Sequence, residues 1–209
     1  MVLIAPPPSQ RRPRPLFSTL AAESSVLRLF QPSVHGASAT SFRFFGPLLR
    51  FDHQRGEGAP VRPGHDEERG IYYAAATLSG CLVEVFGDIG VIDCADWHVA
   101  LVRVRRDLHL LDLRGRGAMR AGTVAAIAKE ASRPLTQAWS RHFYGHAETY
   151  TTVDGLIFFN AHNDETAFAL YERCADALAC PTDSVRRLDH PALRPHLLAE
   201  ADRQNLILA

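Results

Sequence analysis

Residues 70–87 read GIYYAAATLSGCLVEVFG, and this stretch decides the fold. Its first part, Ile71-Tyr72-Tyr73, has a strand-like composition, because aromatic and β-branched residues favour a pleated surface. From Ala74 to Phe86 the pattern changes to that of a helix. Three apolar residues mark one face of this helix: Leu78, Leu82 and Val85. The stretch therefore predicts a strand that leads into a helix over residues 74–86.

Further elements follow without a regular alternation of strand and helix. Residues 98–105 alternate, with Ala100, Val102 and Val104 on one side, which predicts a half-buried strand. Other strands are expected at residues 108–113, 156–159, 166–171 and 184–188. Helices are expected at residues 121–131, 135–143 and about 197–205. This mixture predicts the α+β class rather than a doubly wound parallel sheet.

The first third of the chain is less regular. Residues 1–16 are rich in proline and arginine and predict a disordered leader, too polar to pack, so the domain is expected over residues 17–209. Residues 17–30 predict a helix or a strand without deciding between them. Residues 31–70 contain many glycine, proline and histidine residues. A long irregular segment within a compact domain is usually functional or mobile.

The composition narrows the class of protein. The chain has 209 residues, which suits one domain, and its 23 Lys+Arg balance 23 Asp+Glu. We therefore expect no direct binding to nucleic acid and none to an acidic membrane surface. The chain has no apolar run of 18 residues, and its four cysteines show no CxxC spacing. These features predict a cytoplasmic protein with reduced thiols.

Glu84 is the most informative single residue. It lies away from the apolar face of the expected helix, and the small residues Gly80 and Cys81 precede it by about one turn. A carboxylate beside small residues leaves room for a ligand to approach. The alternative is a solvated glutamate on a polar helix face.

Arg50 and Tyr72 are the other candidates. Arg50 stands between the apolar residues Leu49 and Phe51, so it is expected to be partly buried and to need an anion. Asp52 could supply that anion and give Arg50 a purely structural role. The ring of Tyr72 could fill the core or stack on a flat ligand.

Several common types of site are not supported. His142 and His146 are spaced i, i+4, but Gly145 interrupts the helix and the sequence is not H-E-x-x-H, so no metal site is expected. The chain also has no GxGxxG, no P-loop and no G-x-S-x-G motif, which argues against a Rossmann site and a hydrolase elbow.

Taken in order, several segments resemble the RES family, the toxin half of many bacterial toxin–antitoxin pairs. The resemblance runs from about residue 41 to about residue 190 and rests on order and spacing. Its segments are Arg50-Phe51-Asp52-His53, residues 70–75 and 82–87, Leu110-Leu111-Asp112-Leu113, and residues 155–163 and 169–173.

The resemblance implies a compact single domain similar to ADP-ribosyltransferase toxins, with mixed or antiparallel sheets flanked by helices. It also implies that NAD is the substrate, with no prosthetic group. Arg50 takes the family's arginine position, Tyr72 a site tyrosine and Glu84 the glutamate. Asn160 stands where the family has serine, and Leu49 where it often has glycine. The implied site is therefore Arg50, Glu84 and Asn160 for catalysis, with Arg50, Tyr72 and Glu84 binding NAD.

These residue types suit cleavage of the nicotinamide–ribose bond. A carboxylate can stabilise the positive charge on the ribose, and an arginine can hold the pyrophosphate with two hydrogen bonds. The attacking group could be water or phosphate, giving a glycohydrolase or a phosphorylase. The alternatives are a mono-ADP-ribosyltransferase and a degenerate member that only binds a nucleotide or its antitoxin. The resemblance also implies a cognate antitoxin that blocks the NAD cleft, and a homo-oligomer stays open.

Overall fold

A computed structural model describes residues 2–209, and Met1 lies outside them. Within the described residues, nine strands form one sheet. Its order is β1 (Phe17–Leu20), β8 (Leu108–Asp112), β9 (Gly155–Phe159), β10 (Thr166–Tyr171), β5 (Ile71–Ala75), β2 (Ser25–Phe30), β7 (His98–Val104) and β11 (Leu178–Ala179), and β12 (Val185–Arg187) also pairs with β7. Strands β8 and β9 are parallel, and the other pairs are antiparallel. The predicted mixed sheet is thus confirmed.

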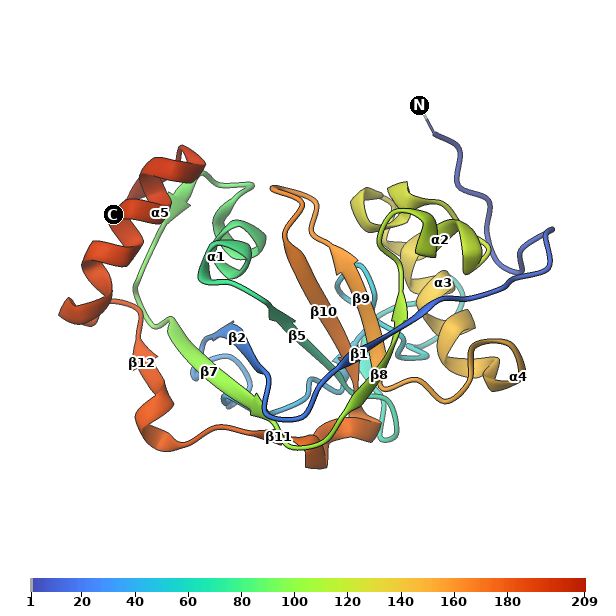
Figure 1. Cartoon of the computed structure of the whole chain (residues 1–209), viewed down its shortest axis with the longest axis horizontal. Coiled ribbons are helices and arrows are strands. Elements are labelled where there is room, and N and C mark those ends of the chain that lie inside the picture. Colours follow the sequence, from blue (N-terminus) through green and yellow to red (C-terminus); the bar gives the residue numbers. More distant parts are fainter. Residues whose placement is uncertain (1) are drawn as a thin grey trace.

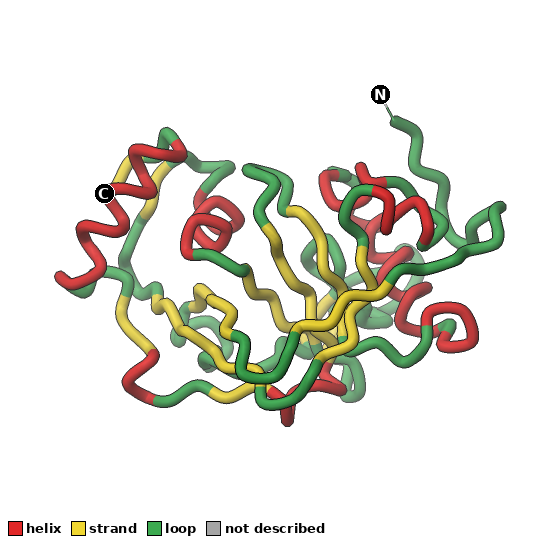
Figure 2. The backbone as a smooth tube through the Cα atoms, in the orientation of Figure 1, coloured by secondary structure: helices red, strands yellow, loops and turns green. Residues whose placement is uncertain are grey.

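Helices flank this sheet at both ends, and the strands form a curved band between them (Figures 1 and 2). The α-helices are α1 (Leu78–Phe86), α2 (Arg116–Arg120), α3 (Arg133–Gly145), α4 (Ala147–Tyr150) and α5 (Arg194–Gln204). Four short 3-10 helices are η1 (Ala125–Lys129), η2 (Glu172–Ala177), η3 (Thr182–Ser184) and η4 (Pro191–Leu193). Two small sheets pair β3 (Phe45–Gly46) with β4 (Gly64–His65), and β6 (Val91–Ile92) with β13 (Ile207–Leu208).

The decisive stretch forms a strand and then a helix, but their boundary differs from the prediction. Strand β5 continues to Ala75, because Ala74 pairs with Phe168 and Ala75 pairs with Ala167 of β10. Helix α1 begins only at Leu78, where the side chain of Thr77 accepts a hydrogen bond from the backbone N–H of Gly80 at 2.9 Å. A threonine in this position satisfies an N–H at the start of a helix. Sheet pairing therefore overrides the helix propensity of the alanines.

Most other predicted elements are confirmed, with shifted ends. In β7 the side chains alternate, with Ala100, Val102 and Val104 buried. The expected helix over residues 121–131 is wrong, because Gly122 has a φ of 94° and separates α2 from η1. Between residues 31 and 70 the only strands are the two-residue β3 and β4.

Three hydrophobic clusters fill the interior of the domain. One packs α3 against β8, β9 and β10 and contains Trp139, Phe143 and Phe158. A second lies on the other face of the sheet and contains Tyr72, Val102 and Leu110. The third joins α1 to α5 and β6; it includes Leu82, Ile92 and Leu197. Helix α1 is therefore fixed through Leu82 and Phe86, which leaves its opposite face free to line a site.

The N-terminal segment packs on the domain. Its described part, residues 2–16, has no helix or strand. Ile4 is nevertheless buried in the cluster around Trp139, and the indole N–H of Trp139 donates to the carbonyl oxygen of Ala5 at 2.9 Å. The backbone N–H of Arg14 donates to the carbonyl oxygen of Arg120 at 2.8 Å. The expectation that this leader is too polar to pack is therefore wrong for its described residues.

No helix among residues 2–209 combines the length and apolar character that crossing a membrane requires.

Candidate functional site

A cavity of about 680 Å³ lies where α1 and the irregular segment 31–70 meet the sheet. At this place β2 and β5 pair through a single residue pair, Leu27 with Ala75. Two small residues, Ala75 on β5 and Gly80 on α1, line the cavity beside this short pairing. Its size falls within the range of ligand pockets, roughly 300–1,000 Å³.

The cavity wall is cationic and aromatic. Four arginines line it, Arg28, Arg43, Arg50 and Arg133, whereas Glu84 is the one acidic side chain among the described lining residues. The aromatic lining consists of Phe42, Phe44, Phe45, Tyr73, Trp97, Phe158 and Phe168. Guanidinium groups bind phosphates with paired hydrogen bonds, and aromatic rings stack on flat rings. The wall therefore suits an anionic ligand that carries flat rings, such as a nucleotide.

Arg50 reaches this cavity from the irregular segment, and its side chain is partly buried there. One of its guanidinium nitrogens donates to the carbonyl oxygen of Glu130. Burial lowers the pKa of Arg50 and Arg133 lowers it further, whereas Glu84 raises it. The structure thus brings Arg50 and Glu84 into one cavity, where a ligand could contact both.

Asp52 supports Arg50 through the backbone and does not pair with its guanidinium. The buried Asp52 carboxylate accepts hydrogen bonds from Arg43 at 2.8 Å, from the Tyr73 hydroxyl at 2.8 Å and from the Leu49 N–H at 2.8 Å. These contacts fix the loop on both sides of Arg50. The alternative in which Asp52 neutralises Arg50 is therefore wrong, and the Arg50 guanidinium has no carboxylate within ion-pair distance in the described structure.

Glu84 lies on the face of α1 that points to the cavity, and its side chain is 39% exposed. Gly80 and Cys81, about one turn earlier, line the same cavity, as their spacing predicts. The Glu84 Oε1 atom accepts a hydrogen bond from the backbone N–H of Ala161 at 3.3 Å. The same oxygen lies 3.8 Å from Nδ1 of His162. Glu84 is thus an exposed carboxylate at the cavity, with one oxygen anchored by a backbone hydrogen bond.

Tyr72 does not line the cavity. It is fully buried on the opposite face of β5, where its hydroxyl donates to the carbonyl oxygen of Ala39 at 2.9 Å. The guanidinium of Arg28 stacks 4.3 Å from its ring centre, and burial raises the pKa of Tyr72. Because side chains alternate along a strand, the neighbouring Tyr73 faces the cavity instead. The core-filling alternative for Tyr72 is therefore the one the structure shows.

Asn160 is also placed outside the cavity lining. It is fully buried at the turn after β9, and its Oδ1 atom accepts from the backbone N–H groups of His162 at 3.0 Å and Asn163 at 2.9 Å. Its Nδ2 atom donates to Oδ1 of Asn163 at 2.7 Å. The amide therefore shapes the turn, and it is not directed at a ligand as the serine-like position implied.

Sequence reasoning missed most of the lining residues, among them Arg28, Tyr73, Trp97 and Arg133. Tyr73 could have been found from the period-2 alternation of β5 once Tyr72 was placed in the core. The others come from β2, the loop before β7 and the first residue of α3. No local motif connects these three residues with Arg50, because only the tertiary fold brings them together.

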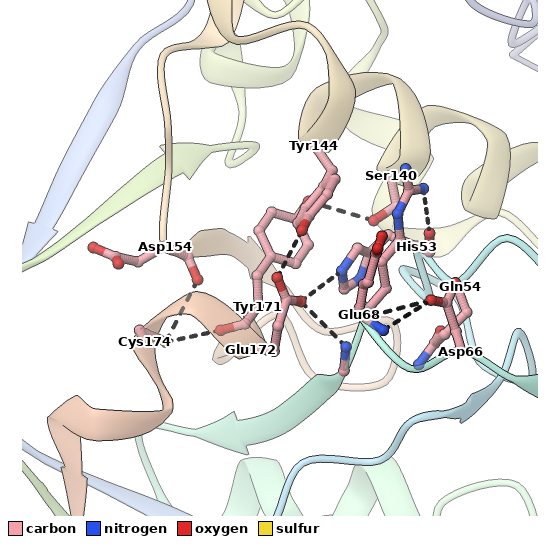
Figure 3. Close-up of polar contacts among 12 residues, drawn as sticks. His53, Gln54, Asp66, Glu68, Ser140, Tyr144, Asp154, Tyr171, Glu172 and Cys174 are labelled. Atoms are coloured by element: carbon pink, nitrogen blue, oxygen red, sulfur yellow. Dashed lines mark hydrogen bonds and ion pairs between the residues drawn. The ribbon is translucent and has the colours of Figure 1, made fainter.

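A second polar cluster lies apart from the cavity lining, around His53 and Glu172 (Figure 3). The fully buried His53 places Nε2 3.0 Å from Oε2 of Glu172, and the Tyr144 hydroxyl donates to Oε1 of Glu172 at 2.7 Å. The nearby Ser140 hydroxyl donates instead to the carbonyl oxygen of Phe51 at 2.6 Å. No serine–histidine pair is formed here, so we assign the cluster a structural role.

Residues 2–209 contain no cluster of three or more His, Cys, Asp or Glu placed to hold a metal ion.

The His53 cluster makes stability depend on pH. Burial lowers the pKa of His53 below its ordinary 6.5, although Glu172 opposes this shift. The unfolded chain therefore binds the proton more tightly, and the contribution of His53 to stability is lost as the pH falls below 6.5. We expect the free energy of unfolding to fall between about pH 7 and pH 5, and to fall less in His53→Gln. Urea unfolding across this range measures both slopes. The control is His196→Gln, at an exposed histidine, which should keep the wild-type slope. If His53→Gln also keeps the wild-type slope, His53 is not the source of the pH dependence.

Comparisons with known proteins identify a family, a curated relative and a similar fold. The RES domain family matches residues 26–192 of the chain. The chain is 32% identical over 90 residues to "Probable toxin y4kH" of Sinorhizobium fredii, a match that covers 43% of this chain and 68% of that protein. It is similar in fold, with a TM-score of 0.54 and 16% identity, to a chain in the crystal structure of the M. tuberculosis MbcT–MbcA toxin–antitoxin complex. That likeness covers 87% of this chain and 92% of the other.

Proposed function

Because the chain belongs to the RES domain family, we propose that it is the toxin of a toxin–antitoxin pair and cleaves the nicotinamide–ribose bond of NAD. The toxin name of the S. fredii relative and the toxin–antitoxin complex among similar folds support the first part. One observation carries the second part. Glu84 and Arg50 share a cavity whose wall is otherwise arginine-rich and aromatic.

The chemistry follows from the charges of the reactants. When the bond between ribose C1′ and the nicotinamide nitrogen breaks, its electron pair leaves with neutral nicotinamide, and positive charge develops on the ribose. A carboxylate held beside that ribose, Glu84, stabilises this charge more than it stabilises the ground state. Water that adds to C1′ and loses a proton gives ADP-ribose, whereas phosphate gives the 1″-phosphate ester of ADP-ribose.

The remaining wall suits the rest of the dinucleotide. Arg50 can grip the pyrophosphate with two N–H groups, and Arg133 beside it can contribute a second positive charge. Tyr73 and Trp97 offer ring faces for the nicotinamide or the adenine. A wall that holds the reacting parts in register lowers the entropic part of the barrier.

A direct assay tests the proposed activity. Purified protein is incubated with NAD in phosphate-free and phosphate-containing buffers, and the products are identified by mass. We expect free nicotinamide in at least one buffer, together with ADP-ribose or its 1″-phosphate ester. In a parallel reaction the NAD carries a label on its ADP-ribose part. Label that becomes attached to protein would indicate ADP-ribosyl transfer instead. NAD that stays intact in both buffers would reject the proposal.

A further inference from the structure

His162 and its turn contact the carboxylate on which the proposed reaction depends. The turn joins β9 to β10 and lies against the C-terminal half of α1. The Nε2 atom of His162 is 3.1 Å from Oδ1 of Asp88, and its Nδ1 atom is 3.8 Å from Oε1 of Glu84. The imidazole therefore stands between two carboxylates, one in the cavity and one on the surface.

The turn itself is built to hold this arrangement. The buried Asn160 accepts hydrogen bonds from the backbone N–H groups of His162 and Asn163. Asn163 in turn donates from Nδ2 to the Ser79 hydroxyl of α1 at 3.1 Å. These bonds fix the backbone so that the N–H of Ala161 points at Glu84. Side chains of the turn thus dock it onto the helix that carries Glu84.

Helix α1 also leaves a space for the imidazole. Its C-cap is Gly87, which has a helical φ of −59°. A Cβ atom at Gly87 would stand 2.4 Å from the carbonyl oxygen of Val83, 2.5 Å from Cδ2 of His162 and 2.9 Å from Nε2 of His162. Cβ atoms do not make contacts that short, so the helix backbone and the ring of His162 together require a glycine here.

We propose that His162, oriented by Asp88, is a positioning residue that holds one oxygen of Glu84 and leaves the other for the ribose. The inference rests on the proposed function, because it assumes that Glu84 meets the substrate. Oε2 of Glu84 has no hydrogen bond within residues 2–209, which fits a free working oxygen. A neutral imidazole has one N–H donor and an imidazolium has two, so the ring can donate to Asp88 from Nε2 and also present an N–H to Glu84 at Nδ1 only as the imidazolium. The hydrogen bond to Asp88 fixes the plane of the ring.

Three variants test the role of His162. We expect His162→Ala to lower kcat for NAD by about tenfold, because the variant loses the 3.8 Å contact between Nδ1 and Oε1 of Glu84, with KM within about twofold of wild type. His162→Gln, which keeps a donor, should recover part of kcat. Asp88→Asn, at a side chain 91% exposed and therefore dispensable for folding, should lower kcat by a smaller factor. Exposed His196→Ala, on α5, should match wild type.

The outcomes separate this inference from the proposed function. If wild type turns over NAD and both His162→Ala and Asp88→Asn keep full kcat, only the positioning role is rejected. A rise in KM with unchanged kcat would also reject it, since His162 would then serve binding. If His162→Ala fails to fold, as judged by its melting curve, Asp88→Asn decides the question alone. If wild type leaves NAD intact, the proposed function is rejected, and the positioning role of His162 is rejected with it.

Discussion

Glu84→Gln is expected to lower NAD turnover on the order of 10³-fold while the protein stays folded. The substitution removes the negative charge and keeps the shape of the side chain. An amide oxygen can still accept the hydrogen bond from the N–H of Ala161, so the local structure should persist. Because the Glu84 side chain is 39% exposed, the change in stability should stay within about 0.5 kcal/mol. Initial rates of nicotinamide release measure the first effect, and urea unfolding measures the second.

Binding separates a catalytic loss from a structural one. Trp97 lines the cavity, whereas Trp139 on α3 is buried in the core, so NAD should change the fluorescence of Trp97. We expect Glu84→Gln to bind NAD with a Kd close to that of wild type, because the carboxylate acts mainly on the transition state. Glu148→Gln, an exposed carboxylate on α4, should retain full turnover. Equal turnover by wild type and Glu84→Gln would remove Glu84 from the mechanism.

The fold was largely readable from local patterns. Period-2 alternation located β7, and helical spacing located α1 and α3, because each element buries one face in the core. The errors occurred where tertiary contacts override propensity. Ala74 and Ala75 favour a helix in isolation, yet pairing with β10 holds them in a strand. Gly122, with its positive φ, interrupts the segment where alanine-rich neighbours suggested one helix over residues 121–131.

The site was readable in part for a similar reason. Arg50 and Glu84 stood out because each places a charge inside an otherwise apolar or small-residue segment, and both line the cavity. Tyr72 is buried in the core and its neighbour Tyr73 lines the cavity, because one position reverses the face of a strand. The contribution of Arg28 and Arg133 could not be predicted, because it depends on sheet order and on where α3 begins.

Asn160 shows how a change of residue type can move a role without removing it. A serine in this turn has one short hydroxyl, whereas the amide of Asn160 bonds to both His162 and Asn163. The asparagine is therefore committed to the turn that supports Glu84. Under the proposed function, a position that was expected to face the ligand would act indirectly, through the backbone N–H of Ala161 and the ring of His162.

Arg50→Ala is expected to lower kcat/KM for NAD by about 10²-fold, mainly through a higher KM. The pyrophosphate would lose two charge-assisted hydrogen bonds, and Arg133 would compensate only in part. Arg50→Lys should recover little of this loss, because an ammonium group cannot form the paired bonds. Steady-state kinetics with NAD measures the effect. Arg141→Ala is a matched control, since Arg141 is also half-buried and donates to a backbone carbonyl, that of Gln54, outside the cavity lining.

A substrate that lacks phosphates tests whether Arg50 acts on the pyrophosphate or on the reacting ribose. Nicotinamide riboside contains the bond that breaks but offers Arg50 nothing to grip, so Arg50→Ala and wild type should cleave it at similar, slow rates. Glu84→Gln should abolish cleavage of both substrates, because the ribose is common to them. An equal loss of riboside cleavage in Arg50→Ala would mean that Arg50 acts on the ribose or on the carboxylate of Glu84. The two side chains would then form one catalytic unit, and their effects would no longer be independent.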